Sequence, residues 1–155
     1  MDLAEAGGGI RFGHRLGLGH CLVGRKIFPR IRPEVIAAEK AIVPYVDIPL
    51  QHIDDGMLAA MQRRTTGTIT RDLLDRLRNA IPDLVLRTTF IVGFPGETDA
   101  QFERLMEFVA EQRFNHVGVF TYSHEENTKA ARVIDDIPSE VKEERRNRLM
   151  HMQQA

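Results

Sequence analysis

From Pro33 onward, apolar residues alternate between spacings typical of strands and spacings typical of helices. Short β-branched or aromatic runs predict strands at 45–48, ended by Pro49, at 84–92 and at 117–121. Helical spacing predicts helices at 33–41, 54–63 and 70–80, another opening at Thr98, and a last one at about 139–152. The regular part of the chain therefore reads as strands alternating with helices.

Polar residues mark several of the predicted helix starts. Asp54 can cap the helix that follows it, and Pro33 suits a first helical position. Thr98 and Gln101 have the spacing of a capping box. Behind these caps, apolar residues recur on one face of each helix: Met57, Leu58 and Met61; Leu73, Leu74 and Leu77; Phe102, Leu105, Met106 and Val109.

This alternation predicts an α/β fold with parallel strands and right-handed crossovers. Three strands are too few to close an eight-stranded barrel, and they make a small open sheet. Either the sheet is incomplete, or the preceding segment supplies a further strand, for which Lys26-Ile27-Phe28 is the candidate.

Residues 1–27 differ from the rest and are predicted to be an irregular, glycine-rich, basic head before the domain at 28–155. Seven of the chain's 12 glycines lie there, and residues 1–32 hold six basic residues against two acidic ones. Gly17-Leu18-Gly19 only weakly resembles the start of a dinucleotide-binding fingerprint. RNA binding by the head is one interpretation, but without interleaved aromatic residues a solvated segment is favoured.

Composition narrows the class of protein. The 155 residues are 43% hydrophobic and 28% charged, typical of a globular domain, and no apolar run is long enough to span a membrane. We expect no signal peptide and a cytoplasmic location. The single cysteine, Cys21, excludes a disulfide framework and any all-cysteine metal or iron–sulfur site built by this chain alone.

Candidate chemistry gathers where the predicted strands end, which is where parallel α/β folds place their sites. These three segments are 47–52 (DIPLQH), 93–98 (GFPGET) and 121–126 (TYSHEE). In the second, two glycines would let a ligand approach the backbone, and the helix start would offer amide donors. A tight strand-to-helix turn capped by Thr98 explains the same residues without a ligand, and Glu97 also suits the helix dipole.

The other polar residues at these ends allow two interpretations. His52 could act as a general acid or base or orient a substrate, or it could be structural. Tyr122 and Ser123 could donate hydrogen bonds into the same region. His124-Glu125-Glu126 lacks metal-ligand spacing and is interpreted as a solvated loop. The last helix is predicted to expose its charged residues, Glu140, Glu143, Glu144, Arg145, Arg146 and Arg148.

Three motifs together resemble the radical S-adenosylmethionine (SAM) methylthiotransferases: Asp47-Ile-Pro-Leu-Gln-His52, Arg87-Thr-Thr-Phe-Ile-Val-Gly-Phe-Pro-Gly-Glu-Thr98 and Gly118-Val-Phe-Thr-Tyr-Ser123. The closing segment 141–154 is also similar to that family's last helix. The similarity begins at about Phe28 and favours the RimO-like branch, which modifies an aspartate of a small-subunit ribosomal protein. A fragment of the tRNA methylthiotransferase branch and a non-catalytic α/β module that binds a nucleotide or partner are the alternatives.

The resemblance implies an incomplete parallel (β/α) barrel of the partial TIM type, with about three to four βα units here. The family holds a [4Fe-4S] cluster through a C-x3-C-x2-C motif, which this sequence lacks. We therefore expect this chain alone to be inactive and of marginal stability. The family's cofactors are that cluster and S-adenosylmethionine, its partner is a small-subunit ribosomal protein, and no membrane partner is expected.

The resemblance also implies cofactor-binding residues at the three strand ends. Gly93, Phe94, Gly96 and Glu97 are expected on the adenosyl side of the cofactor. Gln51, His52, Thr89 and Tyr122 are expected to point into the mouth of the barrel. No metal ligand and no catalytic residue is assigned within the chain.

Overall fold

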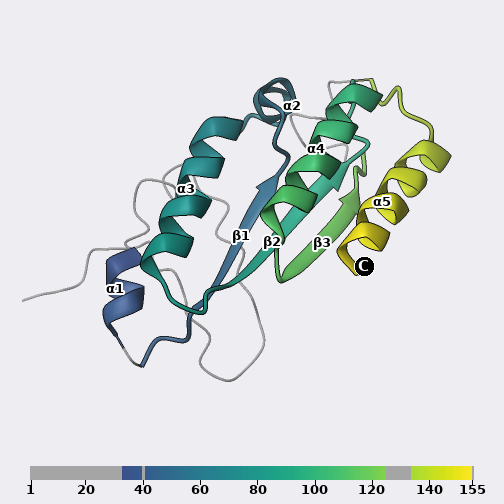
Figure 1. The fold of residues 1–155 in the computed structure, drawn as a ribbon. Coiled ribbons are helices and arrows are strands. Elements are labelled where there is room, and N and C mark those ends of the chain that lie inside the picture. The colour runs from purple at the N-terminus through teal and green to yellow at the C-terminus, as the bar shows by residue number, and fades with distance from the viewer. Residues whose placement is uncertain (1–32, 40, 125–133, 155) are drawn as a thin grey trace, which may run out of the picture.

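The structure is a computed structural model that describes residues 33–39, 41–124 and 134–154. Its elements alternate along the chain (Figure 1): α1 (Pro33–Ala38), β1 (Tyr45–Gln51), α2 (Asp55–Ala60), α3 (Gly67–Ala80), β2 (Val85–Val92), α4 (Asp99–Gln112), β3 (His116–Thr121) and α5 (Ser139–Gln154). The glycine-rich head, Cys21 and the candidate strand at 26–28 lie outside the described residues.

The three strands form one parallel sheet in the order β1-β2-β3, which confirms the predicted α/β fold. Val46 is in register with Leu86, and Thr88 is in register with Val117. In Figure 1, α3 and α4 lie across one face of this sheet, and α5 lies beside β3. All three strands therefore end at the same edge, and most of the predicted site residues follow these ends, whereas Gln51 and Thr89 lie within β1 and β2.

Alternating burial along the strands shows which face packs on the helices. Every second strand residue is buried, including Val46, Ile48, Leu86, Phe90 and Val119. Phe90 contacts the rings of Phe108 and Phe114 edge-on, with centroids 6.3 and 6.1 Å apart. Leu73, Leu74 and Leu77 of α3 complete the core, as their spacing predicts.

The opposite face of the sheet is more open. Phe120 of β3 is 60% exposed and Tyr45 of β1 is 38% exposed, and Arg87 pairs with Asp47 across β2 and β1 at 2.7 Å. A parallel sheet usually has both faces covered, so exposed apolar side chains such as Phe120 mark a face that the described residues leave open. In the described part of the chain, no helix is long and apolar enough to cross a membrane.

Most caps are as predicted, but one strand end is not. Asp54 caps α2, and Thr98 with Gln101 forms the capping box of α4. Pro49 does not end β1, which continues to Gln51. The pairing register shifts between Ile48 and Gln51, so the proline, which lacks an N–H, lies in an irregularity on an edge strand where proline is tolerated.

Element boundaries differ from prediction by a few residues. Helix α3 begins at Gly67 behind a Thr66 cap, because the Thr66 hydroxyl accepts a hydrogen bond from the Ile69 amide. Helices α1 and α2 end earlier than predicted, at Ala38 and Ala60. These shifts are confined to the ends of elements, where local signals are weakest.

Candidate functional site

The turn from β2 into α4, residues 93–98, is the centre of the candidate site. Gly93 and Gly96 have φ of +69° and +79°, a region that L-residues with a side chain rarely adopt. The Glu97 amide donates to the Phe94 carbonyl at 2.9 Å, closing the turn. Glycine is therefore required at two points so that the chain can reverse between the strand and the capped helix.

The carboxylate of Glu97 is fully buried and bonded to three parts of the chain. Its Oε2 accepts from the Gly93 amide at 2.7 Å and from the Arg145 guanidinium at 2.6 Å. Its Oε1 lies 3.1 Å from Nε2 of His52. A buried carboxylate is stable only when its lone pairs are satisfied, and here they are. Glu97 thus joins the ends of β1 and β2 to α5.

His52 is fully buried, and both of its ring nitrogens are engaged. Nδ1 accepts from the Asp54 backbone amide at 3.0 Å, so the proton of a neutral ring is on Nε2, which donates to Glu97. A ring with both nitrogens hydrogen-bonded is fixed in orientation, and it in turn fixes the groups to which it is bonded. The geometry favours the structural interpretation of His52 over general acid–base catalysis.

Arg145 belongs to the site, and the prediction that it lies on an exposed helix face is wrong. Its side chain is 6% exposed, and it donates to the Glu97 carboxylate, to the Glu97 carbonyl at 3.1 Å and to Asp99 at 2.6 Å. Lys142, Arg145 and Leu149 are the buried residues of α5. Their i, i+3, i+7 spacing is a core-facing stripe, and the two cations concealed this signal.

The two glycines of the turn have different surroundings. A Cβ on Gly93 would lie 2.3 Å from Cγ of Lys142, so α5 already fills that space. A Cβ on Gly96 would meet nothing within 4 Å, and Gly96 is exposed. The two amides are not free donors, because Gly93 donates to Glu97 and Gly96 donates to Asp136 at 2.9 Å. Of the two glycines, Gly96 is therefore the one that the described residues leave open to approach.

Phe94 and Tyr122 form an aromatic pair beside the turn. Their ring centroids are 5.0 Å apart in an edge-on arrangement, and Nζ of Lys142 lies 5.2 Å from the centre of the Tyr122 ring. Lys142 also pairs with Asp135 at 2.5 Å. Phe94 is buried and Tyr122 is half-buried, so Tyr122 is the more accessible of the two.

Gln51 and Thr89 lie on the neighbouring strands. Gln51 ends β1 with φ of +73°, and among the described non-glycine residues with positive φ it is the buried one. Such strain persists where the surrounding structure imposes it, and it is found preferentially at functional sites. Thr89 is half-buried on the face of β2 away from the helices, beside Gly118 of β3.

A second charged cluster surrounds Asp54, the cap of α2. Burial opposes ionisation of this carboxyl, but hydrogen bonds from Arg104, Gln101 and the Met57 amide, with the charge of Arg104, outweigh it and hold the pKa of Asp54 below its ordinary value. Arg104 donates to Asp54 at 2.7 Å, and Gln101 donates at 2.8 Å. These hydrogen bonds connect the start of α2 to α4.

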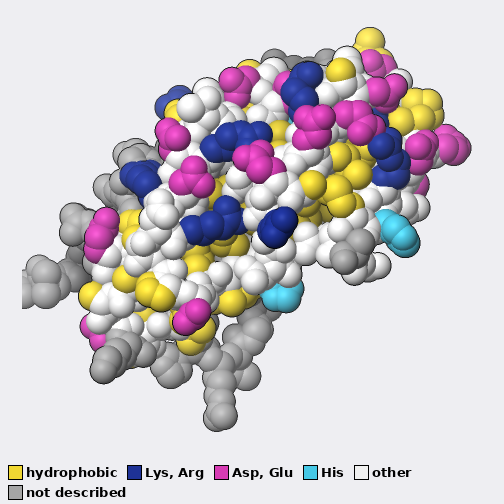
Figure 2. Space-filling view, in the orientation of Figure 1, with side chains coloured by type: hydrophobic (Ala, Val, Ile, Leu, Met, Phe, Trp, Pro, Cys, Tyr) yellow, Lys and Arg dark blue, Asp and Glu magenta, His cyan; other side chains and the backbone are white. Residues whose placement is uncertain are grey.

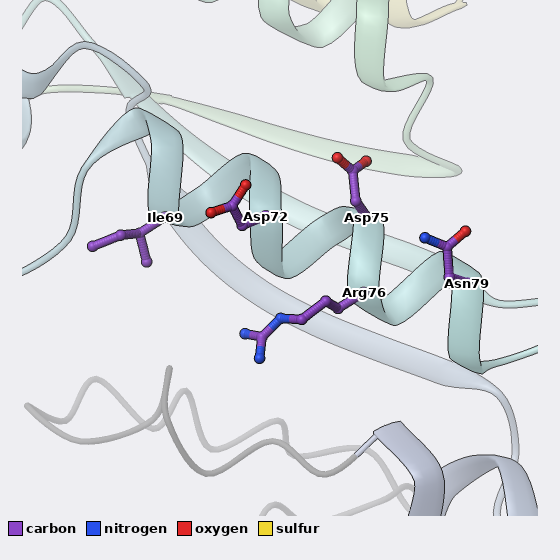
Figure 3. A pocket seen from close by; sticks show the side chains of 5 residues that line it. All are labelled: Ile69, Asp72, Asp75, Arg76 and Asn79. Atoms are coloured by element: carbon purple, nitrogen blue, oxygen red, sulfur yellow. The ribbon is translucent and has the colours of Figure 1, made fainter.

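Elsewhere, a hollow beside the Asp54 cluster is lined by charged residues of α2, α3 and α4, among them Asp55, Arg71 and Glu107. In the orientation of Figure 1, acidic and basic side chains are interspersed over the helices (Figure 2). A shallow hollow on α3 is lined by residues of that one helix, whose side chains diverge rather than converge (Figure 3): Ile69, Asp72, Asp75, Arg76 and Asn79. No group of three or more possible metal ligands occurs in the ranges that the structure describes.

The protein is an open parallel α/β sheet. At the C-terminal ends of its strands lie the buried ion pair of Glu97 and Arg145 and the turn that contains Gly93 and Gly96. Comparison with known proteins identifies this class. A family model, the radical SAM superfamily, matches residues 27–109, and the chain belongs to that superfamily. The coproporphyrinogen III oxidase HemN of Escherichia coli, a radical SAM enzyme, shares the fold with a TM-score of 0.62 at 20% identity, over 79% of this chain and 29% of HemN.

Curated relatives are much more similar in sequence. The ribosomal protein uS12 methylthiotransferase RimO of Syntrophotalea carbinolica is 56% identical over 121 residues, which are 78% of this chain and 27% of that protein. RimO of Anaeromyxobacter sp. is 53% identical over 132 residues, 83% of this chain and 28% of that protein. The resemblance inferred from three motifs is confirmed, and the chain spans about a quarter of the length of these relatives.

Proposed function

We propose that this chain is the part of a RimO-type methylthiotransferase that holds the adenosyl side of S-adenosylmethionine, and that the whole enzyme modifies ribosomal protein uS12. The identity of more than half of the aligned residues with RimO carries this proposal. The same relatives do not favour the tRNA branch or the non-catalytic module. A ribosomal substrate would place the reaction in the cytoplasm.

The residues present fit part of S-adenosylmethionine. Gly96 offers an exposed backbone with open space above it, so a nucleoside can approach there. Thr89 and Tyr122, both half-buried, would contact the ligand from β2 and from the end of β3. The strained backbone of Gln51 supports a site at this edge. The buried residues would act indirectly, by shaping the turn that the ligand contacts: Gly93, Phe94, His52 and Glu97.

The residues present do not fit the iron–sulfur cluster. Such clusters need several thiolate ligands, and the sequence contains one cysteine, Cys21. When bound, the cluster supplies the electron that cleaves S-adenosylmethionine. Its ligands would have to come from outside this chain, so we assign this chain no step in that chemistry.

Binding is tested by isothermal titration of the 155-residue chain with S-adenosylmethionine. We expect saturable binding that Gly96→Val abolishes, because the added side chain fills the open approach and is strained at the positive φ of residue 96. Asn79→Ala, in the hollow on α3, is the control and should bind as the wild type does. Equal loss in both variants, or none in either, would remove the turn from the site.

The substrate is tested separately, by exchanging the matching segment of Syntrophotalea carbinolica RimO for residues 28–155 of this chain. The chimera is supplied with uS12, and the methylthio group on its aspartate is detected by mass spectrometry. A chimera that cleaves S-adenosylmethionine but leaves uS12 unmodified would retain the cofactor role and reject the substrate. The Gly96→Val chimera serves as the negative control.

A further inference from the structure

Helix α5 reaches into the candidate site through two side chains: Lys142 packs against Gly93, and Arg145 bonds to Glu97. One guanidinium nitrogen donates to both the carboxylate and the carbonyl of Glu97, and the other donates to Asp99. Arg145 therefore holds Glu97 by its backbone and its side chain together. The planar guanidinium can make these bonds at once, which an ammonium group on a lysine cannot reproduce.

Glu97 connects Arg145 to the other end of the turn. The Glu97 oxygen that accepts from Arg145 also accepts from the Gly93 amide at 2.7 Å. The second Glu97 oxygen bonds to His52 at the end of β1. Loss of Arg145 would leave a buried carboxylate with neutral donors only, and burial makes such a charge costly. The carboxylate would then move toward water and release Gly93.

The same helix provides a matched comparison. Arg148 lies over the Phe102 ring at 5.0 Å, and Arg145 lies over the same ring at 5.6 Å. Arg148 pairs with Glu103, but both side chains are about half exposed, at 43% and 50%. Since exposed pairs contribute little, removing Arg148 deletes an arginine from α5 without touching the turn.

We propose that Arg145 is a positioning residue for cofactor binding: it fixes the conformation of residues 93–97 through Glu97 and so sets the affinity for the adenosyl ligand without touching it. This inference rests on the proposed function for its second half, because that half requires the ligand to bind at the turn. The first half concerns the turn alone and is measured without ligand.

The test compares Arg145→Ala with Arg148→Ala in the 155-residue chain. The turn is followed by the NMR signal and hydrogen exchange of the Gly93 amide, and affinity by titration with S-adenosylmethionine. For Arg145→Ala we expect a shifted, faster-exchanging Gly93 amide and affinity roughly 10- to 100-fold weaker, as when a residue that orients a binding group is lost. Arg148→Ala should match the wild type in both readouts.

Added guanidinium chloride provides a rescue that a general packing role would not show. In Arg145→Ala, millimolar guanidinium should restore the Gly93 signal and part of the affinity, whereas sodium chloride at equal ionic strength should not. If Arg145→Ala does not fold, Arg145→Lys replaces it. That variant keeps the charge but not the fork, and it should shift Gly93 and weaken binding.

Each outcome decides the proposal. An unchanged Gly93 signal and unchanged affinity in the variant that folds would overturn it. A shifted Gly93 signal with unchanged affinity would show that Arg145 fixes the conformation of the turn but does not set the affinity for the ligand. If the wild-type chain does not bind S-adenosylmethionine, the proposed function of this chain and the second half of the inference fall together, while the Gly93 measurement still decides the first half.

Discussion

Two carboxylate–arginine pairs lie at the same end of the sheet, and they differ in burial. Glu97 and Arg145 have side chains 0% and 6% exposed, whereas Asp54 and Arg104 are 14% and 52% exposed. His52 lies between the two pairs, with one nitrogen on Glu97 and the other on the Asp54 amide. Water can replace a lost partner at Asp54 but not at Glu97. The comparison shows that burial decides how much the fold depends on each pair: loss of the buried pair should destabilise the protein more than loss of the exposed pair.

The largest effect is expected from Glu97→Ala. This change leaves the His52 donor buried without its acceptor and removes the buried partner of the Arg145 charge, which keeps Asp99 and the backbone carbonyl of residue 97. We expect a loss of about 3–5 kcal/mol in the free energy of unfolding. Urea unfolding followed by circular dichroism measures it. A loss no greater than that of Asp54→Ala would show that burial does not separate the two pairs.

The two glycines of the turn offer the next largest effect. Gly93→Ala and Gly96→Ala share the strain of a positive φ, which costs roughly 1–2 kcal/mol. Gly93→Ala also collides with Lys142, so it should lose about 1–3 kcal/mol more than Gly96→Ala.

Shortening Lys142 sharpens this measurement. Lys142→Ala removes the Cγ and Cδ atoms that collide with the added Cβ and keeps the Cβ of residue 142, 3.0 Å away. The penalty of Gly93→Ala relative to glycine should therefore be smaller in that background. Equal penalties in both backgrounds, measured by urea unfolding, would mean that the contact with α5 is not what requires glycine at position 93.

A smaller effect is expected from Asp54→Ala. The change removes the cap of α2 and the exposed pair with Arg104, and we expect a loss of about 1–2 kcal/mol, mostly from the cap. Asp54→Asn, which retains a capping side chain, is the control and should lose less. An equal loss in the two variants would show that the charge matters more than the cap.

The smallest effect concerns pH. Because the pKa of Asp54 in the folded chain is below its ordinary value of 3.8, its ionisation stabilises the fold above that pH. The contribution disappears as pH falls through the lower, folded pKa. Asp54→Asn cannot titrate there, so its stability should fall less than that of the wild type between about pH 5 and pH 2. Parallel acid dependences in the two proteins would contradict this.

Local signals in the sequence predicted much of the fold. The caps at Asp54 and Thr98, the apolar faces of α3 and α4 and the parallel order of the strands all depend on neighbouring residues or on chain order. The prediction that Pro49 ends β1 was wrong because proline interrupts a strand only where the pairing requires an N–H at that position. The local sequence does not specify whether it does. The cofactor-binding residues stay a prediction; the sequence also left the buried setting of His52 and Glu97 open.

What the sequence by itself determined was the set of elements, their caps and the family, because these depend on residue type and spacing within short segments. Only the tertiary structure decided that Arg145 is buried, that Glu97 faces inward and that Lys142 fills the space at Gly93 while Gly96 stays open. The physical reason is that Arg145 and Glu97 are 48 positions apart. A charge in a helix has the same local pattern whether it faces water or a partner, and only packing distinguishes the two.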